Sequence, residues 1–371
     1  MRTEQILQVL DLARESYASD IIFSPGNPPF VRVGGVYRYL REFPPLGIDE
    51  VWEVVERFLP EWAYKNARTR AQGQKTPEDI QFSYTGAITR YRVQVAWVLA
   101  SKESGEDVIA PMVTLRLIPR TPWPFRDLGL PDGLLEFTRY DVGLVLVAGP
   151  TDSGKTTTLA SLVDHINGTE TKHVLTVERP IEYVHSSRRS VIHQREVGRH
   201  VVSVPQAVHT ALRSNVDVIV VGEARSGEEY RAVLEAAETG HLVLASMHAP
   251  GVVEAIERFV HATPQEDQAL VRQVLANVLL GVVVQRLLPT GSPWRSLAYE
   301  FLAVDSRARE AIKKGEYEKL YSIMESRQAD MRTLEQSVAE LVRMEKVPLE
   351  VARFYVNREE RLFYYLSGKR P

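Results

Sequence analysis

The sequence predicts an α/β protein of two domains, in which an α+β domain precedes a domain built on a parallel sheet. In the N-terminal part, apolar residues recur with a period of two, as in half-buried antiparallel strands. After a proline-rich stretch, apolar runs alternate with helical patterns, which indicates βαβ units. One of these runs leads into Gly149–Thr156, a glycine loop that opens a helix.

The N-terminal domain is expected to span residues 1–118. Its strands turn apolar side chains to one face and polar side chains to the other, and a Gly34-Gly35 pair marks a hairpin. The predicted elements are helices over 1–18 and 51–58, strands at 20–23, 30–33, 36–40, 91–97 and 113–117, and a polar loop over 64–78.

A change in composition marks the domain boundary. Pro119, Pro122 and Pro124 fix φ and remove N–H donors, which predicts an extended linker over 119–125. The second domain, residues 126–371, then alternates strands with helices and ends in a mostly helical C-terminal part. Its predicted elements are strands at 144–148, 174–177, 216–221 and 242–245 and helices at 156–166, 205–213 and 228–238.

The composition is that of an ordinary globular protein. The chain has 371 residues, of which 44% are hydrophobic and 25% charged, with a net charge of −3. This balance does not indicate nucleic-acid binding, which favours strongly basic domains. The absence of cysteine excludes disulfides and thiolate zinc sites. Met1–Ala18 lacks the apolar core of a signal peptide, and no run approaches the roughly 20 apolar residues of a transmembrane helix, so we expect a cytoplasmic protein.

The glycine loop has the arrangement that phosphate binding requires. Its backbone N–H groups turn inward around phosphate oxygens, and its glycines permit that path. In this pattern Lys155 contacts the β- and γ-phosphates, the Thr156 hydroxyl binds Mg²⁺, and the following helix adds its positive N-terminal end. We therefore expect ATP and Mg²⁺ to be bound by Gly149, Pro150, Thr151, Asp152, Ser153, Gly154, Lys155, Thr156 and Thr157.

Candidate catalytic residues follow the other predicted strands. Glu223 ends an apolar strand pattern and can polarise the attacking water directly or through the Mg²⁺ shell. Glu178 and Glu182 follow the strand before it, at the edge where parallel sheets bind ligands. His248 follows the strand after it and is a candidate for sensing the γ-phosphate or for coupling to the neighbouring subunit, although a lone histidine is more often structural.

Arginines crowd the polar faces of the N-terminal strands, at Arg90, Arg92 and Arg116. The ordinary interpretation is a solvated face. The alternative is that they act in trans and neutralise charge on ATP bound to a neighbouring subunit.

These segments, in this order, resemble the secretion-ATPase superfamily of ring motors, and more narrowly its PilT-type pilus-retraction ATPases. The likeness extends over nearly the whole chain. The segments that resemble the family are Tyr91-Arg92-Val93, Leu115–Pro119, the Walker A segment Gly149–Leu159, the Asp box Val174–His185, Gln194–Gly198, the Walker B segment Asp217–Arg225, the His box Ala236–His248, Gln285–Pro289 and Thr333–Ser337.

The resemblance implies a PAS-like N-terminal domain and a RecA-like ATPase domain, assembled as a homo-hexamer with ATP between subunits. It implies that the chain powers pilus retraction, twitching motility and DNA uptake through an inner-membrane platform protein, to which it binds peripherally. A second pilus ATPase is a further candidate partner, and direct contact with nucleic acid is not expected. The implied catalytic residues are Glu223, Glu178, Glu182, His248, Arg92 and Arg116.

Three departures from the family pattern point to a divergent paralogue. Arg179 stands where the family reads aspartate in Glu-Asp-Pro-Ile-Glu, so a cation replaces an anion beside the site. Ser246–Pro250 keeps the histidine of Thr-Leu-His-Thr-Asn but loses its polar neighbours. The Ala-Ile-Arg-Asn-Leu-Ile signature retains only Arg309 and Ile312.

Two alternatives stay open at this point. One is an assembly or secretion ATPase of the same superfamily, but those usually carry an extra N-terminal domain and a four-cysteine zinc insertion, which this cysteine-free chain lacks. The other is an accessory ring that binds nucleotide and hydrolyses little, which Arg179 and Ala249-Pro250 motivate. Against the accessory ring, all the groups that phosphoryl transfer needs are present.

Overall fold

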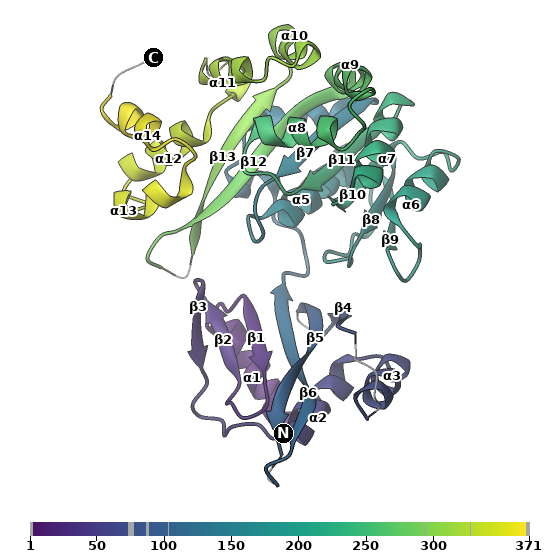
Figure 1. Cartoon of the computed structure of the whole chain (residues 1–371), viewed down its shortest axis with the longest axis vertical. Helices are drawn as coiled ribbons and strands as arrows, with labels where there is room; N and C mark the ends of the chain where they lie inside the picture. Colours follow the sequence, from purple (N-terminus) through teal and green to yellow (C-terminus); the bar gives the residue numbers. More distant parts are fainter. Residues whose placement is uncertain are drawn as a thin grey trace. The chain divides into compact units, whose positions relative to one another are not determined.

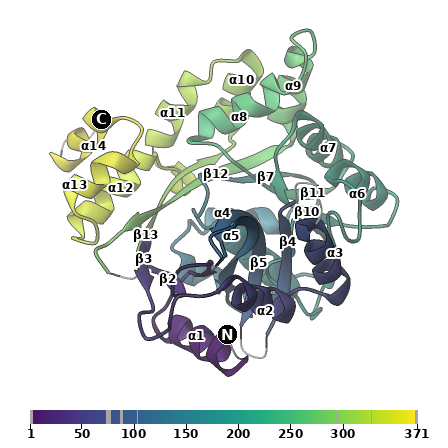
Figure 2. The ribbon, with the colours of Figure 1, turned by 60° about the horizontal axis from the view of Figure 1, so that its bottom comes forward.

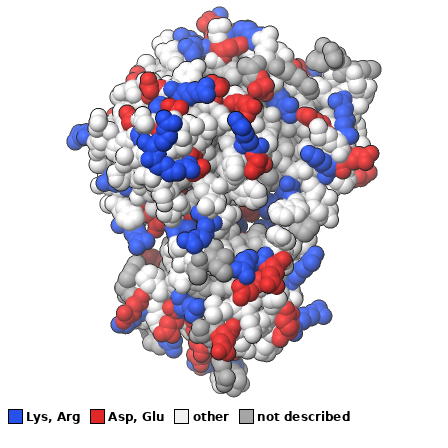
Figure 3. Space-filling model, turned by 180° about the vertical axis from the view of Figure 1, so that it is seen from behind, with Lys and Arg blue, Asp and Glu red and all other residues white. Residues whose placement is uncertain are grey.

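The computed structural model describes residues 3–72, 78–86, 89–102, 104–292, 294–326 and 328–368. The chain divides into two compact units, here called unit 1 and unit 2 (Figure 1). Unit 1 is Met1–Arg120 with Gly291–Trp294, and unit 2 is Thr121–Thr290 with Arg295–Pro371. On the face shown in Figure 3, basic and acidic side chains are mixed over both units.

Unit 1 is an antiparallel six-stranded sheet with the strand order β3-β2-β1-β6-β5-β4. Its helices share one apolar core with the strands, and Phe23, Val93 and Leu115 are fully buried in that core. Its elements are α1 (Thr3–Glu15), β1 (Asp20–Phe23), β2 (Phe30–Val33), β3 (Val36–Tyr39), α2 (Ile48–Phe58), α3 (Glu61–Gln72), β4 (Ile80–Thr85), β5 (Arg90–Ser101) and β6 (Asp107–Ile118).

The loop predicted over 64–78 is wrong in its first part, because α3 occupies Glu61–Gln72; residues 73–77 lie outside the described residues. Among the α3 side chains that the structure describes, Ala63 and Ala67 form a narrow buried stripe and Lys65 and Thr69 are exposed, so the segment looks polar in sequence. Tyr64 and Trp52 also pack, with ring centroids 5.9 Å apart. Residues of high helix propensity form a helix once such a stripe docks on a core.

Unit 2 is a seven-stranded sheet with the order β13-β12-β7-β11-β10-β8-β9, in which only β13 is antiparallel to its neighbour. Its strands are β7 (Gly143–Ala148), β8 (His173–Glu178), β9 (Val191–Glu196), β10 (Val218–Ala224), β11 (Leu242–Met247), β12 (Leu279–Pro289) and β13 (Arg295–Ala303). Its α-helices are α4 (Gly133–Glu136), α5 (Lys155–Thr169), α6 (Val204–Ala211), α7 (Gly227–Glu238), α8 (Val252–His261), α9 (Gln268–Val278), α10 (Ser306–Lys314), α11 (Glu318–Glu325), α12 (Leu334–Arg343), α13 (Leu349–Ala352) and α14 (Glu359–Leu366).

Helices cover both faces of this sheet (Figure 2). Along β7, Leu144 and Leu146 belong to the core formed with α6–α9, whereas Val145 and Val147 belong to the core formed with α5. A strand that is buried on both faces has to be apolar at every position, which is why the sequence shows continuous runs there. The α/β class, with an antiparallel N-terminal sheet followed by a parallel-rich sheet, is confirmed.

The C-terminal region is less helical than predicted, because it contains β12 and β13, which pair over Gly281–Pro289. Helix α9 ends at Val278 and β12 begins at the next residue, so no turn residues separate the two patterns. The stripe that contains Leu334, Val338 and Leu341 does form a helix, α12, whose N-cap Thr333 makes a capping box with Gln336. Within the residues that the structure describes, no helix has the length and apolar character of a membrane span.

Candidate functional site

The predicted site residues of unit 2 come together at one edge of its sheet. Strands β7, β11, β10 and β8 are consecutive neighbours and run parallel, so their carboxyl ends lie side by side. The glycine loop follows β7, His248 follows β11, Glu223 lies near the end of β10, and Glu178 ends β8. This edge is where parallel sheets bind ligands.

Glycine is required at the start of the loop. The φ of Gly149 is +147°, and a Cβ there would lie 2.5 Å from both the Gln285 carbonyl oxygen and Ser153 Oγ. At the other end, Gly154 caps α5 with a φ of +92°. At Gly149 the loop lies so close to β12 that no Cβ fits, and both glycines have a positive φ that residues with a Cβ rarely adopt.

The loop contains polar groups that fit an anion. Lys155 is 8% exposed, and its Nζ donates to the carbonyl oxygens of Gly149 at 3.1 Å and Pro150 at 2.7 Å. Burial lowers the pKa of Lys155, while Glu223 and Asp152 act to raise it. Ser153 Oγ is buried without a hydrogen-bond partner. A phosphate oxygen would give the Ser153 hydroxyl an acceptor and the Lys155 ammonium an anionic partner. The residues therefore fit a nucleotide phosphate chain.

Thr156 and Thr157 lie in the first turn of α5, directly after Lys155. The Thr157 hydroxyl lies 3.3 Å from the Tyr183 hydroxyl, so the loop is tied to the segment that follows β8. Thr156 stands at the position that holds Mg²⁺ in a glycine loop of this pattern, and its oxygen is a ligand type that suits the ion.

Glu178 lies in a hydrogen-bond network at the end of β8. Its Oε1 accepts from Thr176 Oγ1 at 2.6 Å and from Gln194 Nε2 at 3.0 Å. Burial raises the pKa of Glu178 to about 7, the two donors act against that rise, and Glu182 adds to it. Gly222 packs so closely that a Cβ there would lie 3.2 Å from Glu178 Cγ. Glu178 therefore contacts the strand that bears Glu223.

Gln194 was not among the predicted site residues, although its Gln194–Gly198 segment was part of the family resemblance. Besides Glu178, its Nε2 donates to the Tyr183 carbonyl oxygen at 2.8 Å, and its Oε1 accepts from His185 N at 2.9 Å. One amide thus fixes Glu178 and the loop after β8 together. Glu182 lies in that loop, where the neighbouring Ile181 N–H donates to Glu196 Oε2 at 3.1 Å.

Glu223 is held from two sides. Its Oε2 accepts from Arg225 Nε at 2.7 Å, and its Oε1 pairs with His248 Nε2. The Glu223 side chain is 20% exposed and that of His248 is 43% exposed. The structure thus brings Glu223 and His248 into direct contact. Arg225 was not predicted as a site residue, because no local motif showed which way its side chain turns.

Arg179, the residue that replaces the family's aspartate, pairs with a carboxylate of its own chain. Its NH2 nitrogen lies 3.4 Å from Glu229 Oε1 at the start of α7. The Arg179 side chain is 34% exposed and that of Glu229 is 10% exposed. The cation at position 179 is therefore offset by a carboxylate of the same chain.

Arg92 and Arg116 belong to unit 1, whereas the residues above belong to unit 2. They are directly opposite each other on β5 and β6. Arg116 Nε donates to Asp20 Oδ1 at 2.8 Å, and Asp20 is only 4% exposed. With the Gln81 amide in the orientation that satisfies both groups, its oxygen accepts from Arg92 at 2.8 Å. Both arginines are thus oriented by neighbours rather than extended freely into solvent.

Strand β12 connects the loop to other parts of unit 2. Gln285 is 2% exposed, and its Nε2 donates to Thr158 Oγ1 on α5 at 2.9 Å. The next residue, Arg286, donates to the carbonyl oxygens of Pro250 at 2.9 Å and Tyr355 at 2.8 Å. Two consecutive residues therefore contact the helix of the glycine loop on one face and the segment after His248 on the other.

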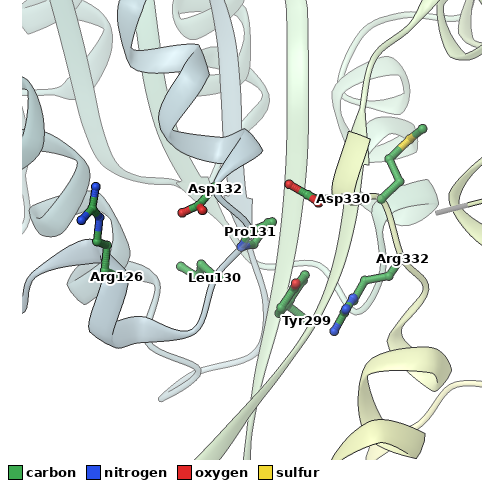
Figure 4. Close-up of a pocket in the computed structure, with 8 residues that line it drawn as sticks. Arg126, Leu130, Pro131, Asp132, Tyr299, Asp330 and Arg332 are labelled. Carbon is green, nitrogen blue, oxygen red and sulfur yellow. The ribbon is translucent and has the colours of Figure 1, made fainter. Parts of the chain in front are cut away.

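A separate pocket of about 650 Å³ lies elsewhere in unit 2 (Figure 4). In Figure 4, Asp132 and Asp330 flank Pro131, and Arg332 lies beside Tyr299. Arg332 stacks on the Tyr299 ring at 5.0 Å and pairs with Glu340 at 2.9 Å. None of the residues that line this pocket belongs to the glycine loop, and none is one of the site carboxylates described above.

Comparison with known proteins gives one family and several relatives. The model of the family described as type II/IV secretion system protein matches residues 74–295. A Neisseria gonorrhoeae protein named "Twitching motility protein" is 33% identical over 91% of this chain and 86% of its own length. The "Type IV pilus retractation ATPase PilT" of Pseudomonas aeruginosa is 33% identical over 94% of this chain and 97% of its own. The solved "Crystal Structure of the Pilus Retraction Motor PilT and Bound ADP" is 35% identical, with a TM-score of 0.81 over 96% of this chain and 98% of that one.

We predict that Gly149→Ala weakens the binding of a fluorescent ATP analogue by at least about tenfold, because the Cβ forces the loop away from β12. Gly168→Ala in α5 is the matched control, since its nearest neighbour is the flexible end of Arg188 at 3.4 Å. Fluorescence titration of both variants measures the effect. Equal affinities would show that the loop tolerates a different path.

We predict that Glu178→Gln alters the dependence of stability on pH. A carboxyl whose pKa rises on folding, here from 4.5 to about 7, loses its contribution to stability as pH rises through that interval. Relative to the unaltered chain, the variant should therefore gain up to about 3 kcal/mol between pH 4.5 and 7 and change little above. Urea unfolding of the variant and the unaltered chain at several pH values measures the difference, because the titrating groups that both proteins share contribute equally to each. A constant difference would contradict the raised pKa.

Proposed function

This chain belongs to the family of type II/IV secretion system proteins, and on that premise we propose that it is an ATP-hydrolysing motor for retraction of type IV pili. The observation that supports this most directly is Glu223, which lies between Arg225 and His248 on a strand beside the glycine loop. Relatives of nearly the same length whose names specify retraction or twitching favour this role over assembly or secretion.

The first step is binding of the ATP phosphate chain by the loop. Lys155 exchanges the carbonyl oxygens of Gly149 and Pro150 for the β- and γ-phosphates, and Ser153 and the first N–H groups of α5 donate to the same chain. Thr156 would hold Mg²⁺, which neutralises charge on the β- and γ-phosphate oxygens when bound. The pairing of a buried ammonium with phosphate offsets its desolvation.

The second step is in-line attack by water. Glu223 orients the water and accepts its proton as the new bond from oxygen to the γ-phosphorus forms. The bond from that phosphorus to the β–γ bridging oxygen breaks, and ADP leaves with the electron pair. His248 contacts Glu223, so it links the presence of the γ-phosphate to the position of the carboxylate. Glu178 and Glu182 hold the neighbouring segment after β8 in place.

The assembly is proposed as a homo-hexamer in which Arg92 and Arg116 of one subunit neutralise charge on ATP bound to the next. Their orientation by Gln81 and Asp20 favours a fixed contact surface over a disordered one. The domains are proposed as 1–118, a linker at 119–125 and 126–371. The motor is proposed to act peripherally on an inner-membrane platform protein from the cytoplasmic side, with a second pilus ATPase as a candidate partner.

We expect Lys155→Ala to abolish turnover by removing the phosphate contact, and Glu223→Gln to bind ATP while turnover falls by at least about a hundredfold. Steady-state hydrolysis with Mg²⁺, nucleotide titration and oligomer mass on the same samples measure these effects. Normal turnover in Lys155→Ala would remove the loop from the mechanism. A hexamer without any turnover in the unaltered chain would favour an accessory ring.

For the arginines, we expect Arg92→Ala to form rings of normal mass but to hydrolyse ATP roughly tenfold or more slowly. Arg116→Lys should also slow ATP hydrolysis, because the lysine keeps a positive charge beside Asp20 but lacks the planar guanidinium group. Arg41→Ala, at an exposed position of unit 1, is the control. Unchanged rates in the first two variants would return these arginines to the solvated-face interpretation.

A further inference from the structure

The pair formed by Arg179 and Glu229 joins two segments that are far apart in sequence. Arg179 follows directly after β8, and Glu229 lies in the first turn of α7. Glu229 is 7% exposed, so its charge has to be balanced by groups of the protein rather than by water. Arg179 is the cation that supplies this balance, with its NH2 nitrogen 3.4 Å from Glu229 Oε1.

The second oxygen of Glu229 fixes the backbone next to the proposed catalytic residue. Its Oε2 accepts from the Arg225 N–H at 2.6 Å. The Glu229 N–H in turn donates to the N-cap Ser226 Oγ at 3.3 Å, which closes the turn from 225 to 229. This turn is packed closely, because a Cβ on Gly227 would lie 2.8 Å from the Ala262 carbonyl oxygen.

The Arg225 side chain completes the connection. Once its backbone is fixed by Glu229, its guanidinium reaches back two residues, and Nε donates to Glu223 Oε2 at 2.7 Å. The contacts therefore run without a gap from Arg179 to Glu229, to Arg225 and to Glu223. Each of these three contacts ends on a carboxylate, so all three are charge-assisted hydrogen bonds, which are stronger than neutral ones.

We propose that Glu229 is a positioning residue for Glu223, and that Arg179 holds Glu229 in place, so that the segment after β8 and the segment after β10 move as one. This inference rests on the proposed ATPase function. Without Arg179, a nearly buried anion loses its cation and turns toward water. It then releases the Arg225 N–H, and Glu223 loses the fixed partner that aims its carboxylate at the attacking water.

The proposal separates catalysis from nucleotide binding. None of the contacts in the series involves the glycine loop, so the affinity for ATP should not depend on them. The proposal also assigns a use to the residue that departs from the family pattern: Arg179 acts through a carboxylate on α7, and it does not contribute a free cation to the phosphates. A purely structural ion pair would instead affect stability without changing the balance between kcat and KM.

The test compares Arg179→Ala, Glu229→Gln, the double variant and Arg179→Lys in the full-length protein. We expect each of the first two to lower kcat roughly ten- to a hundredfold, with KM for ATP unchanged within about twofold. The double variant should be no slower than Glu229→Gln alone, because both changes break one series of contacts. Arg179→Lys should restore kcat to within about threefold, since it retains the charge.

Arg332→Ala is the matched control. It removes an arginine of similar exposure in the same unit, whose partners Glu340, at 2.9 Å, and Tyr299 lie outside the turn from 225 to 229. Its kcat should match that of the unaltered chain even if its melting temperature falls. If it slows as much as Arg179→Ala, general loosening of unit 2 explains the result and the proposal is wrong.

Hydrogen–deuterium exchange supplies a readout that does not need turnover. In Arg179→Ala and in Glu229→Gln, the peptide that contains the Arg225 amide should exchange faster, while peptides of the glycine loop should not change. If exchange at the Arg225 amide stays the same in both variants while the unaltered chain hydrolyses ATP, the positioning role is wrong and the proposed function stands. If the variants exchange faster but the unaltered chain does not hydrolyse ATP, the series of contacts is supported and the proposed function is wrong.

Discussion

The site depends on a sheet that is buried on both faces. Helices cover both sides of β7, β11, β10 and β8, so ligands can approach only at the strand ends. Because these four strands are neighbours and parallel, residues far apart in sequence meet at that edge without any special arrangement of loops. This one constraint determines where the glycine loop, Glu223, His248 and Glu178 lie.

Low solvent access at the same edge explains the chemistry of its charges. Burial lowers the pKa of Lys155 and raises the pKa of Glu178 to about 7. Each charge is then assigned a partner within the protein: carbonyl oxygens for Lys155, hydroxyl and amide donors for Glu178, and Arg179 for Glu229. When a phosphate binds, Lys155 exchanges its carbonyl partners, whereas the N–H groups at the start of α5 are already oriented by the helix.

The sequence predicted the local features of the site and missed those that depend on tertiary contacts. The glycine loop is a local motif, and Glu223 could be placed because it ends an apolar run. Gln194, Arg225 and Glu229 could not be placed, because their roles come from partners 16, 2 and 50 residues away that no periodicity identifies. The errors in the predicted fold have the same origin. The secondary structure of α3 and of β12 depends on the cores against which they pack, and their own sequence patterns do not indicate it.

The two consecutive residues of β12 have an evolutionary consequence. Gln285 contacts α5 and Arg286 contacts the segment after His248, on opposite faces of one strand. A slip by one residue would exchange these two side chains between the faces, since strand side chains alternate. An insertion or deletion beside Gln285 and Arg286 would therefore break both contacts, whereas one in the connection to β13, beyond Pro289, would leave them in place. Homologues of this chain should differ in the length of that connection while keeping β12 constant.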